Sequence, residues 1–305
     1  MTGHTVAVTG ATGFLGRYAV DALLRSGAHV VGVVRNPDRV PSLAARGVEM
    51  RRADLADRKA LAAGFAGADA VVSNAALFSL GNRRWEDHER ANVEGTQNVF
   101  DALADAGVRR AVHVSSVAVY RGHQPPMNED APQLGPDTRR TPTNVYSISK
   151  AVSEQLAWRL ARERGIELTA VRPCAIYGAF DPNFTRIFRR LIGLPVTVMP
   201  AWFHLALVYA GDVADGIVRA LERPASVGRV YNLTGDDVSV WSFADAWRAA
   251  GGPSAQLMVP IPVPMTRVYD TTRARTELGW SNRSYVDALR ETFALEAQDG
   301  ASASR

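Results

Sequence analysis

Tyr146 and Lys150 stand four residues apart, and the only other lysine in the chain is Lys59. A chain that otherwise uses arginine is expected to keep lysine where a compact ammonium is needed instead of a planar fork. A spacing of four residues places both side chains on one helix face. An ammonium beside a phenol lowers the tyrosine pKa, which makes the phenol a proton donor and acceptor usable near neutral pH. The alternative is a surface pair on an ordinary helix, and the rest of the chain argues against it.

A glycine-rich turn follows the first apolar segment. Residues 5–9 form a short β-branched run typical of a buried parallel strand, and a helical pattern after the turn ends near Ser26. Glycines at such a junction let backbone N–H groups approach a pyrophosphate, which the helix N-terminus also attracts. The sequence therefore predicts a dinucleotide-binding cradle. Its residues are Gly10, Thr12, Gly13, Phe14, Leu15 and Gly16.

The second predicted strand, residues 29–34, ends at Arg35. An acidic residue at this point would bind the ribose 2′-hydroxyl of NAD, whereas an arginine suits the 2′-phosphate of NADP. Arg39 is a second candidate for the same phosphate. We therefore expect NADP(H) as the preferred cofactor, with NAD(H) as the alternative. The simpler interpretation of Arg35 is a solvated cation at a strand end.

The third and fourth predicted strands also end in candidate cofactor residues. The third strand is followed by Asp54 and Leu55, and Asp54 either accepts a hydrogen bond from the adenine amino group or caps the helix that begins near Asp57. The fourth strand, residues 70–73, leads into small residues that would let the cofactor lie close to the backbone. They are Asn74, Ala75 and Ala76.

Length and composition limit the classes of protein that the chain can form. Its 305 residues suffice for one large domain or two closely joined ones, and an apolar fraction of 47% can fill a sizeable core. Lysine and arginine number 35 against 31 acidic residues, for a net charge of +4. The arginines are scattered in pairs and form no basic stripe, so we expect no nucleic-acid partner.

Cys174 is the only cysteine, which excludes an intramolecular disulfide and fits a reducing compartment. The N-terminus lacks a signal-peptide pattern, and no stretch of about 18 apolar residues could cross a membrane. The histidines have no metal-ligand spacing. We therefore expect a cytoplasmic protein with a small-molecule substrate, no membrane partner and no metal.

A fifth predicted strand, residues 110–114, delivers the serine pair Ser115 and Ser116. With the glycine pattern and the Tyr146–Lys150 pair, the chain resembles the extended short-chain dehydrogenase/reductase family, which includes nucleotide-sugar epimerases and ketone reductases. The resemblance covers nearly the whole chain. Further matching segments are Asn92–Asn98, Arg172–Gly178, Asp212–Ala214 and Arg273–Trp280.

The resemblance implies a role for each matching residue. Ser116 would bind the substrate oxygen, with Ser115 as the fallback, and Tyr146 would exchange the proton. Lys150 would lower the pKa of Tyr146 and bind the nicotinamide ribose. The carboxamide of the nicotinamide would lie between Pro173 and Ile176.

Two departures from the family pattern limit the reactions that the chain is expected to catalyse. Dehydratases carry an Asp-Glu pair beside the catalytic serine, where this chain has Val117 and Ala118. Epimerases carry an arginine that holds the substrate diphosphate, and the matching position here is Leu205. Four arginines could replace it, so the epimerase alternative stays open. They are Arg186, Arg189, Arg190 and Arg267.

The expected substrate wall is apolar, which suits a ring-bearing hydrophobic ligand. Its candidate residues are Phe78, Trp85, Phe180, Phe184, Trp202 and Phe203, and several of these could be ordinary core residues. His204 lies near the expected mouth of the site and is a further candidate substrate contact.

The alternation of strands and helices predicts an α/β fold with a doubly wound parallel sheet of the Rossmann type. Residues 1–174 and 205–234 would form the dinucleotide-binding domain. Residues 175–204 and 235–298 would form a smaller C-terminal substrate-binding lobe, and 299–305 a disordered tail. The resemblance also implies a homodimer formed by the helices near residues 85–106 and 146–163.

These features predict an NADP(H)-dependent oxidoreductase that reduces the ketone of a fairly apolar small molecule, or oxidises the corresponding alcohol, with Tyr146 as proton donor or acceptor. One alternative is a nucleotide-sugar epimerase with tightly bound NAD(P). A more remote alternative is a non-catalytic NADP-binding regulator, against which the intact Ser116, Tyr146 and Lys150 set argues.

Overall fold

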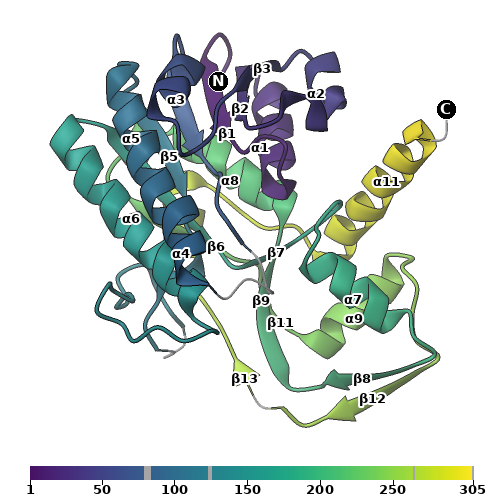
Figure 1. Cartoon of the computed structure of the whole chain (residues 1–305). Coiled ribbons are helices and arrows are strands. Elements are labelled where there is room, and N and C mark those ends of the chain that lie inside the picture. Colours follow the sequence, from purple (N-terminus) through teal and green to yellow (C-terminus); the bar gives the residue numbers. More distant parts are fainter. Residues whose placement is uncertain (79–83, 123–125, 264, 304–305) are drawn as a thin grey trace.

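The computed structural model describes residues 1–78, 84–122, 126–263 and 265–303. Within these residues, seven parallel strands form the central sheet of the larger domain (Figure 1). In spatial order they are β10 (Val230–Leu233), β6 (Glu167–Pro173), β5 (Arg110–Val114), β4 (Ala70–Ser73), β1 (Thr5–Thr9), β2 (His29–Val34) and β3 (Glu49–Arg52). The predicted doubly wound parallel sheet is confirmed, and the carboxyl ends of its strands share one edge.

Helices cover both faces of this sheet. On one face α1 (Phe14–Arg25) packs against α8 (Ala210–Glu222), and on the other α5 (Gly95–Asp105) lies between α3 (Arg58–Phe65) and α6 (Val145–Arg164). The five inner strands β1, β2, β4, β5 and β6 contribute to both layers. Val6 and Val8 belong to the core beneath α1, while Ala7 belongs to the core beneath α5. Burial on both faces explains why these strands are continuous apolar runs.

Short elements connect the main layers. They are η1 (Pro37–Arg39), α2 (Pro41–Ala45), α4 (Trp85–His88), the π-helical turn η2 (Glu89–Glu94), η3 (Val117–Val119) and η4 (Pro224–Ser226). The turn η2 joins α4 directly to α5 and packs against α6. It lies beside the carboxyl edge of the sheet, where loops from β4 and β5 also end.

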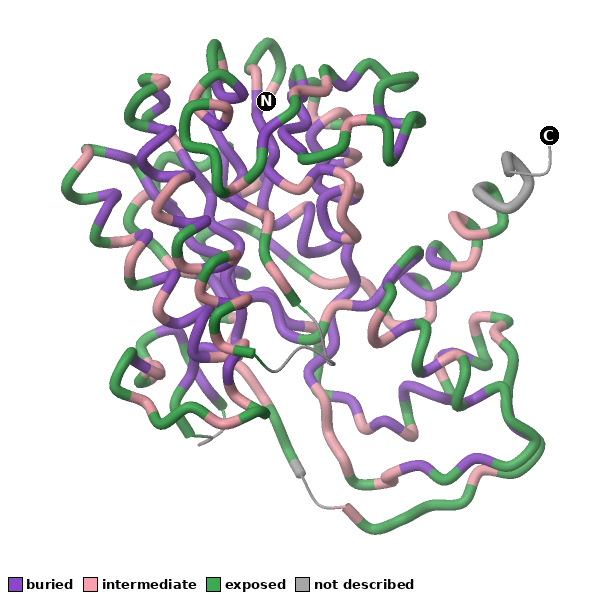
Figure 2. Tube along the Cα trace, in the orientation of Figure 1, coloured by how far each residue is buried: buried purple, intermediate pink, exposed green. Residues whose placement is uncertain are grey.

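A smaller lobe is built from the remaining strands and helices. Strand β9 (Phe203–Tyr209) pairs with β7 (Ala175–Tyr177), β11 (Asp237–Ser239) and β13 (Met265–Thr266). A parallel ribbon of β8 (Val196–Pro200) and β12 (Leu257–Ile261) extends beyond them. The helices of the lobe are α7 (Phe184–Ile192), α9 (Val240–Ala249) and α11 (Tyr285–Ala303), whereas α10 (Thr272–Leu278) packs against β10 and α8 of the sheet domain. Figure 2 shows buried positions throughout the sheet domain and exposed ones along the outer ribbon.

Three segments differ from the predicted domain limits. Helix α10 lies within residues 235–298, which were predicted to belong to the lobe, but it packs against β10 and α8 of the sheet domain. Residues 205–234 were expected to return to the large sheet, and α8 and β10 do so, but β9 joins the small sheet. The reason is that β10 already occupies the edge of the large sheet beside β6. Helix α11 continues to Ala303, past residue 299 where disorder was expected. Residues 304 and 305 lie outside the described residues.

A buried ion pair joins α6 to β6. Arg172 donates to both carboxylate oxygens of Glu154, at 2.5 and 3.0 Å, and each side chain is only 1% exposed. Arg172 also donates to the Tyr120 hydroxyl at 2.9 Å, and that hydroxyl donates to the Asn232 amide oxygen at 2.6 Å. The network therefore connects α6, β6, β10 and the segment after β5.

We predict that Glu154→Gln destabilises the fold strongly, because it leaves the Arg172 guanidinium buried without its counter-charge. The expected loss is about 3 kcal/mol in the free energy of unfolding. Glu163→Gln on the same helix is the matched control, since it breaks only the exposed Arg159–Glu163 pair and should cost about 0.5 kcal/mol or less. Chemical denaturation followed by circular dichroism measures both, and equal small losses would contradict the prediction.

Candidate active site

The glycine turn after β1 forms a cradle at the N-terminus of α1. Gly10 adopts a left-handed conformation with φ of 67°, and a Cβ at Gly16 would lie 2.1 Å from the Gly10 carbonyl oxygen. A side chain at position 16 would therefore force the turn apart. The first turn of the 12-residue helix α1 contains no acidic residue. Open backbone and a helix N-terminus fit the pyrophosphate of a dinucleotide.

A cavity of about 1610 Å³ extends from this cradle across the carboxyl edge of the sheet into the lobe. Nearly all residues that the sequence predicted for the cofactor line it. They are Gly10, Thr12, Gly13, Phe14, Leu15, Arg35, Asp54, Leu55, Asn74, Ala75, Ala76, Tyr146, Lys150, Pro173 and Ile176. Gly16 is absent from this wall and instead supports the turn from within α1.

Arg35 and Asp54 form the far end of the cavity. The Arg35 side chain is 77% exposed, and its Nε lies 3.9 Å from the nearer Asp54 carboxylate oxygen. This loose contact leaves most guanidinium donors available to an anionic ligand. Asp54 accepts from the Ala56 amide, whereas Asp57 caps α3. The capping role considered for Asp54 therefore belongs to Asp57.

The loop after β4 lies flat against the cradle. The Thr9 hydroxyl accepts from the amides of Asn74 and Ala75, both at 3.0 Å. Asn92 in η2 holds the next part of this loop, because its oxygen accepts from the Leu77 amide at 2.7 Å. The Asn92 amide group also donates to the Ser149 hydroxyl at 2.9 Å. These contacts link the loop after β4 to α6.

The three candidate catalytic side chains meet in the cavity wall. The Ser116 hydroxyl lies close enough to Tyr146 to lower the phenol pKa, and its oxygen accepts from the Ala118 amide at 3.1 Å. Lys150 donates to the Val114 carbonyl at 2.7 Å. Ser115, the fallback serine, is buried, and its hydroxyl has no hydrogen-bond partner among the described residues. The geometry thus joins Ser116, and not Ser115, to Tyr146.

Burial shifts both titratable groups of this set. Loss of solvent raises the pKa of Tyr146 to about 12, although the nearby Ser116 hydroxyl acts in the opposite direction. Burial lowers the pKa of Lys150 to about 8, against the influence of Glu154. The lowered Tyr146 pKa predicted from the Tyr–Lys spacing is therefore not what the structure shows. Desolvation of the phenol dominates, and the Lys150 ammonium faces the Val114 carbonyl.

The lobe supplies an apolar wall at the opposite end of the cavity. Phe78 packs edge-on against Tyr146 with 4.9 Å between ring centroids, and Phe184 stacks on Phe188 at 5.7 Å. The apolar lining includes Phe78, Phe184, Ile187, Phe188, Leu191, Val198, Met199, Phe203, Leu205 and Val240. Of the predicted aromatic wall, Phe78, Phe184 and Phe203 line the cavity.

Trp85 and His204 lie outside the cavity wall, although both were expected to contact substrate. The Trp85 indole donates to Glu89 at 2.8 Å, and the Arg140 guanidinium lies 3.9 Å from the ring centroid. The His204 ring nitrogen lies 2.8 Å from an Asp237 carboxylate oxygen. Both side chains are occupied by partners at the surface.

Phe180 and Trp202 also lie outside this wall. Phe180 has a left-handed backbone conformation with φ of 67°, and its ring faces the Arg17 guanidinium at 5.1 Å. Trp202 is 61% exposed in the turn that follows β8. An aromatic residue in a loop carries no sequence signal for the direction in which its side chain points.

Sequence reasoning missed several residues that line the site. On α7, Phe188 and Leu191 continue the helical period that begins at Phe184, and this spacing could have identified them. Tyr269 carries no comparable signal. Arg267, considered only as a substitute for the epimerase arginine, lines the cavity and has a side-chain hydrogen bond with Tyr269.

The described part of the chain gives little support for thiol or metal chemistry. Cys174 lines the cavity, but burial raises the pKa of its thiol to about 12, which disfavours the reactive thiolate. Among the described residues, no cluster of three or more His, Cys, Asp or Glu side chains is suited to a metal ion. A search of the described helices found none long and apolar enough to cross a membrane.

Comparison with known proteins identifies the class to which this site belongs. Residues 6–234 match the NAD dependent epimerase/dehydratase family, and the chain belongs to this family. It is 34% identical to a 4-hydroxy-2-methyl-3-oxo-4-farnesyl-3,4-dihydroquinoline-1-oxide ketoreductase of Stigmatella aurantiaca, over 77% of this chain and 70% of that protein. It is 32% identical to cinnamoyl-CoA reductase 1 of Petunia hybrida, over 75% and 72% of the two chains.

A solved structure supports the same assignment. UDP-glucose-4-epimerase from Stenotrophomonas maltophila superposes with a TM-score of 0.83 at 25% identity, over 98% of this chain and 99% of that one. The predicted resemblance to the extended short-chain dehydrogenase/reductase family is confirmed. The chain is an NAD(P)-dependent oxidoreductase of this type.

We predict that Lys150 makes stability depend on pH. Its pKa falls from 10.5 to about 8 on folding, so between these values the unfolded chain binds more protons and stability rises with pH. Lys150→Met removes this dependence. Between pH 8 and pH 10.5, the free energy of unfolding of the wild type should therefore rise by about 3 kcal/mol relative to that of the variant.

Denaturation at a series of pH values measures this shift. Lys59→Met is the matched control, because Lys59 is the other lysine and is exposed. A wild-type curve that runs parallel to the Lys150→Met curve across this range would contradict the predicted burial of the charge.

Proposed function

We propose that this protein is an NADP(H)-dependent oxidoreductase that reduces a ketone of a fairly apolar small molecule. The observation that carries the proposal is one continuous cavity with three parts. A dinucleotide cradle occupies one end, Ser116, Tyr146 and Lys150 stand in the middle, and apolar side chains line the other end. A volume of about 1610 Å³ exceeds a typical single-ligand site and offers room for a cofactor and a substrate together.

The chemistry follows from the positions of the three side chains. A bound nicotinamide cofactor would supply the hydride that a ketone carbon accepts. The Ser116 hydroxyl would hold the ketone oxygen, and the Tyr146 phenol would transfer its proton to that oxygen. With a pKa of about 12, the phenol carries its proton at neutral pH, as an acid must. Lys150 would stabilise the phenolate left behind and bind the ribose.

The proposed substrate is apolar because the lobe lines its end of the cavity with hydrocarbon. Phe78 packs against Tyr146 itself, so a flat or ring-bearing group would find a surface next to the proton donor. The ketoreductase of Stigmatella aurantiaca, by its name, acts on a farnesylated ring ketone. This likeness supports a hydrophobic ketone without identifying it.

The proposed preference for NADP(H) rests on Arg35. Its guanidinium is mostly exposed at the cavity end and holds Asp54 only loosely. Arginine presents paired donors to a phosphate, and Arg39 lines the same end. A 2′-phosphate would meet positive charge here, whereas the bare ribose of NAD would gain little from it.

Arg267 favours one alternative reaction. It lines the cavity next to Leu205, the position where the epimerases of this family carry their diphosphate-binding arginine. A nucleotide sugar could therefore find one cation in the site. Such an epimerase would isomerise a UDP-sugar without net consumption of NADPH, and the same assay that detects ketone reduction separates the two reactions.

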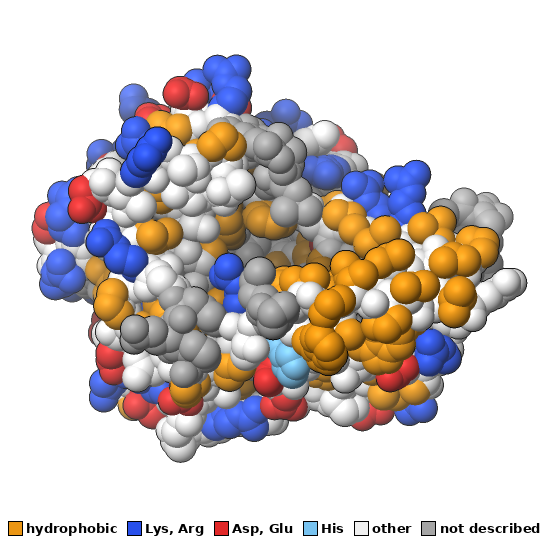
Figure 3. Space-filling view, turned by 90° about the horizontal axis from the view of Figure 1, so that it is seen from below, with side chains coloured by type: hydrophobic (Ala, Val, Ile, Leu, Met, Phe, Trp, Pro, Cys, Tyr) orange, Lys and Arg blue, Asp and Glu red, His pale blue; other side chains and the backbone are white. Residues whose placement is uncertain are grey.

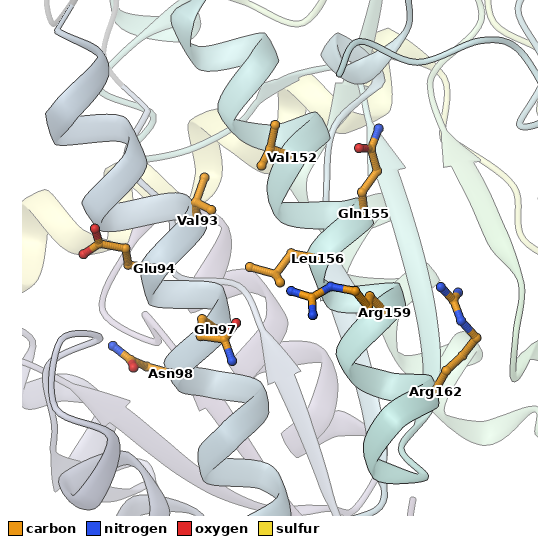
Figure 4. A pocket seen from close by; sticks show the side chains of 9 residues that line it. All are labelled: Val93, Glu94, Gln97, Asn98, Val152, Gln155, Leu156, Arg159 and Arg162. Atoms are coloured by element: carbon orange, nitrogen blue, oxygen red, sulfur yellow. The ribbon is translucent and has the colours of Figure 1, made fainter. Parts of the chain in front are cut away.

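We also propose a homodimer formed by α5 and α6. A groove of about 820 Å³ runs between these helices and the turn η2 on the outside of the molecule (Figure 4). Leu156 and Val93 lie in its centre, and Arg159 and Glu94 carry opposite charges within it. A second copy related by a two-fold axis could pair these charges while covering the apolar centre.

We predict that Tyr146→Phe abolishes ketone reduction but leaves dinucleotide binding intact. Phenylalanine keeps the ring that packs on Phe78 and removes only the proton donor. Loss of general acid catalysis is expected to lower kcat by about 100-fold to 10,000-fold. A panel of apolar ketones followed by NADPH absorbance gives the rate, and fluorescence titration gives the cofactor affinity. A Tyr146→Phe enzyme with wild-type kcat would refute the proposed mechanism.

We predict that Arg35→Ala weakens NADPH binding by about 10-fold to 100-fold, the value of a charged hydrogen bond, and changes NADH binding little. Arg46→Ala is the matched control, because Arg46 is an exposed arginine of the same domain outside the cavity. Fluorescence titration with both cofactors measures the effect. Equal losses for NADPH and NADH would instead assign Arg35 a general structural role.

A further inference from the structure

The lobe presents a concentration of large apolar side chains to solvent, which we call the apolar lobe face (Figure 3). It consists of Ile187, Leu191, Leu194, Val196, Val198, Trp202, Leu257, Val259 and Ile261. Single exposed apolar residues are ordinary on protein surfaces, but a contiguous group of this kind indicates an interaction site.

The ribbon of β8 and β12 forms the centre of this face. The register places Leu257 beside Val196 and Val259 beside Val198. Val196, Val198 and Leu257 are each more than half exposed, at 55%, 57% and 56%. Thr197 and Met199, which alternate with the valines, are buried. One side of the ribbon therefore packs on the lobe while its other side is an open apolar sheet.

Helix α7 adds cations to the edge of the apolar residues. Arg186 and Arg190 are exposed and lie one turn apart, next to the exposed Ile187 and Leu191. Among the described residues, neither arginine has an ion-pair partner, whereas Arg189 on the same helix pairs with Glu296. A helix edge with apolar and unpaired basic side chains is typical of segments that lie on anionic lipid.

The apolar lobe face is continuous with the cavity. Ile187, Leu191 and Val198 belong to the exposed face and also line the cavity. Figure 3 shows the orange side chains of this face reaching the hollow in the molecule, with basic side chains along another border. A hydrophobic ligand could pass from an apolar phase into the cavity along these three side chains without crossing water.

We propose that the apolar lobe face docks on the surface of an anionic lipid membrane. Trp202, at the end of β8, is well suited to the membrane interface, where tryptophan is enriched. The docking is peripheral and leaves no membrane-spanning segment, so the sequence search for a span could not detect it. The proposal concerns this surface alone and holds whichever reaction the cavity performs.

Charge favours lipid over a second copy of the chain as the occupant. Face-to-face pairing of two copies would bring Arg186 and Arg190 of each into one interface, and none of the residues that make up the apolar lobe face is acidic. Anionic headgroups would neutralise both, and each basic residue near such a surface contributes favourably. The proposed α5–α6 dimer groove lies on the other side of the molecule from α7 and β8, so a dimer would leave the face open (Figure 1).

The test is vesicle binding by the intact chain. Binding is measured by co-sedimentation with phosphatidylcholine vesicles, with and without phosphatidylglycerol, at low and high salt. The sheet variant Val196→Gln with Leu257→Gln should lose binding to both kinds of vesicle. Arg186→Gln with Arg190→Gln should weaken binding to the anionic vesicles by about 25-fold, or fivefold for each arginine, and high salt should reduce that difference.

Arg109→Gln with Arg223→Gln is the matched control, since it removes two exposed arginines from the sheet domain. Circular dichroism and NADPH titration check that each variant is folded, and none of the substituted residues lines the cavity. Three results would overturn the proposal. They are no vesicle binding by the wild type, equal binding by the sheet variant, and a smaller sedimentation mass of the sheet variant, which would assign the face to contact between copies.

Discussion

The ion pair between Arg172 and Glu154 is the contact on which the arrangement of the site depends. Glu154 lies one helical turn after Lys150, and Arg172 directly precedes Pro173 in the cavity wall. One buried interaction therefore sets the position of the helix that carries Tyr146 relative to the strand beside the proposed nicotinamide site. Because both charges are out of solvent, the pair tolerates little change in geometry, which suits a position that must fix distances.

The same absence of water determines the protonation of the catalytic groups. Burial raises the pKa of Tyr146 and lowers the pKa of Lys150, so both shifts favour the neutral form. His113, on β5, follows the same rule, since burial and the nearby Lys150 lower its pKa well below 6.5. With a pKa of about 8, Lys150 still keeps its proton at neutral pH, so it is charged beneath the cavity together with the Arg172–Glu154 pair. A phenol that is protonated at neutral pH is in the form that can protonate a ketone oxygen, which fits the proposed reduction.

The cofactor half of the site could be predicted because its signals are local. Gly10 and Gly16 are required by a turn within one short segment, and buried strands are visible as apolar runs. Parallel strands end at one edge, so Ser116 and the Tyr146 helix meet there. The substrate half depends on how distant segments pack. The helical period groups Phe184 with Phe188 and Leu191, but no local signal shows that this group lines the cavity while Trp202 faces solvent. The pKa of Tyr146 was predicted in the wrong direction for the same reason, since spacing reports a neighbour but not the depth of burial.

The two halves of the cavity also differ in the substitutions that they tolerate. At the cradle, backbone atoms approach so closely that a single added Cβ would collide, which restricts residue types whatever the substrate. At the lobe, contacts are made by side chains of α7 and β8, and substitutions there alter shape without disturbing the sheet. Ile187, Leu191 and Val198 belong both to the cavity lining and to the outer face. A change at any of them alters substrate fit and the exposed surface together, so these two properties of the lobe are physically coupled.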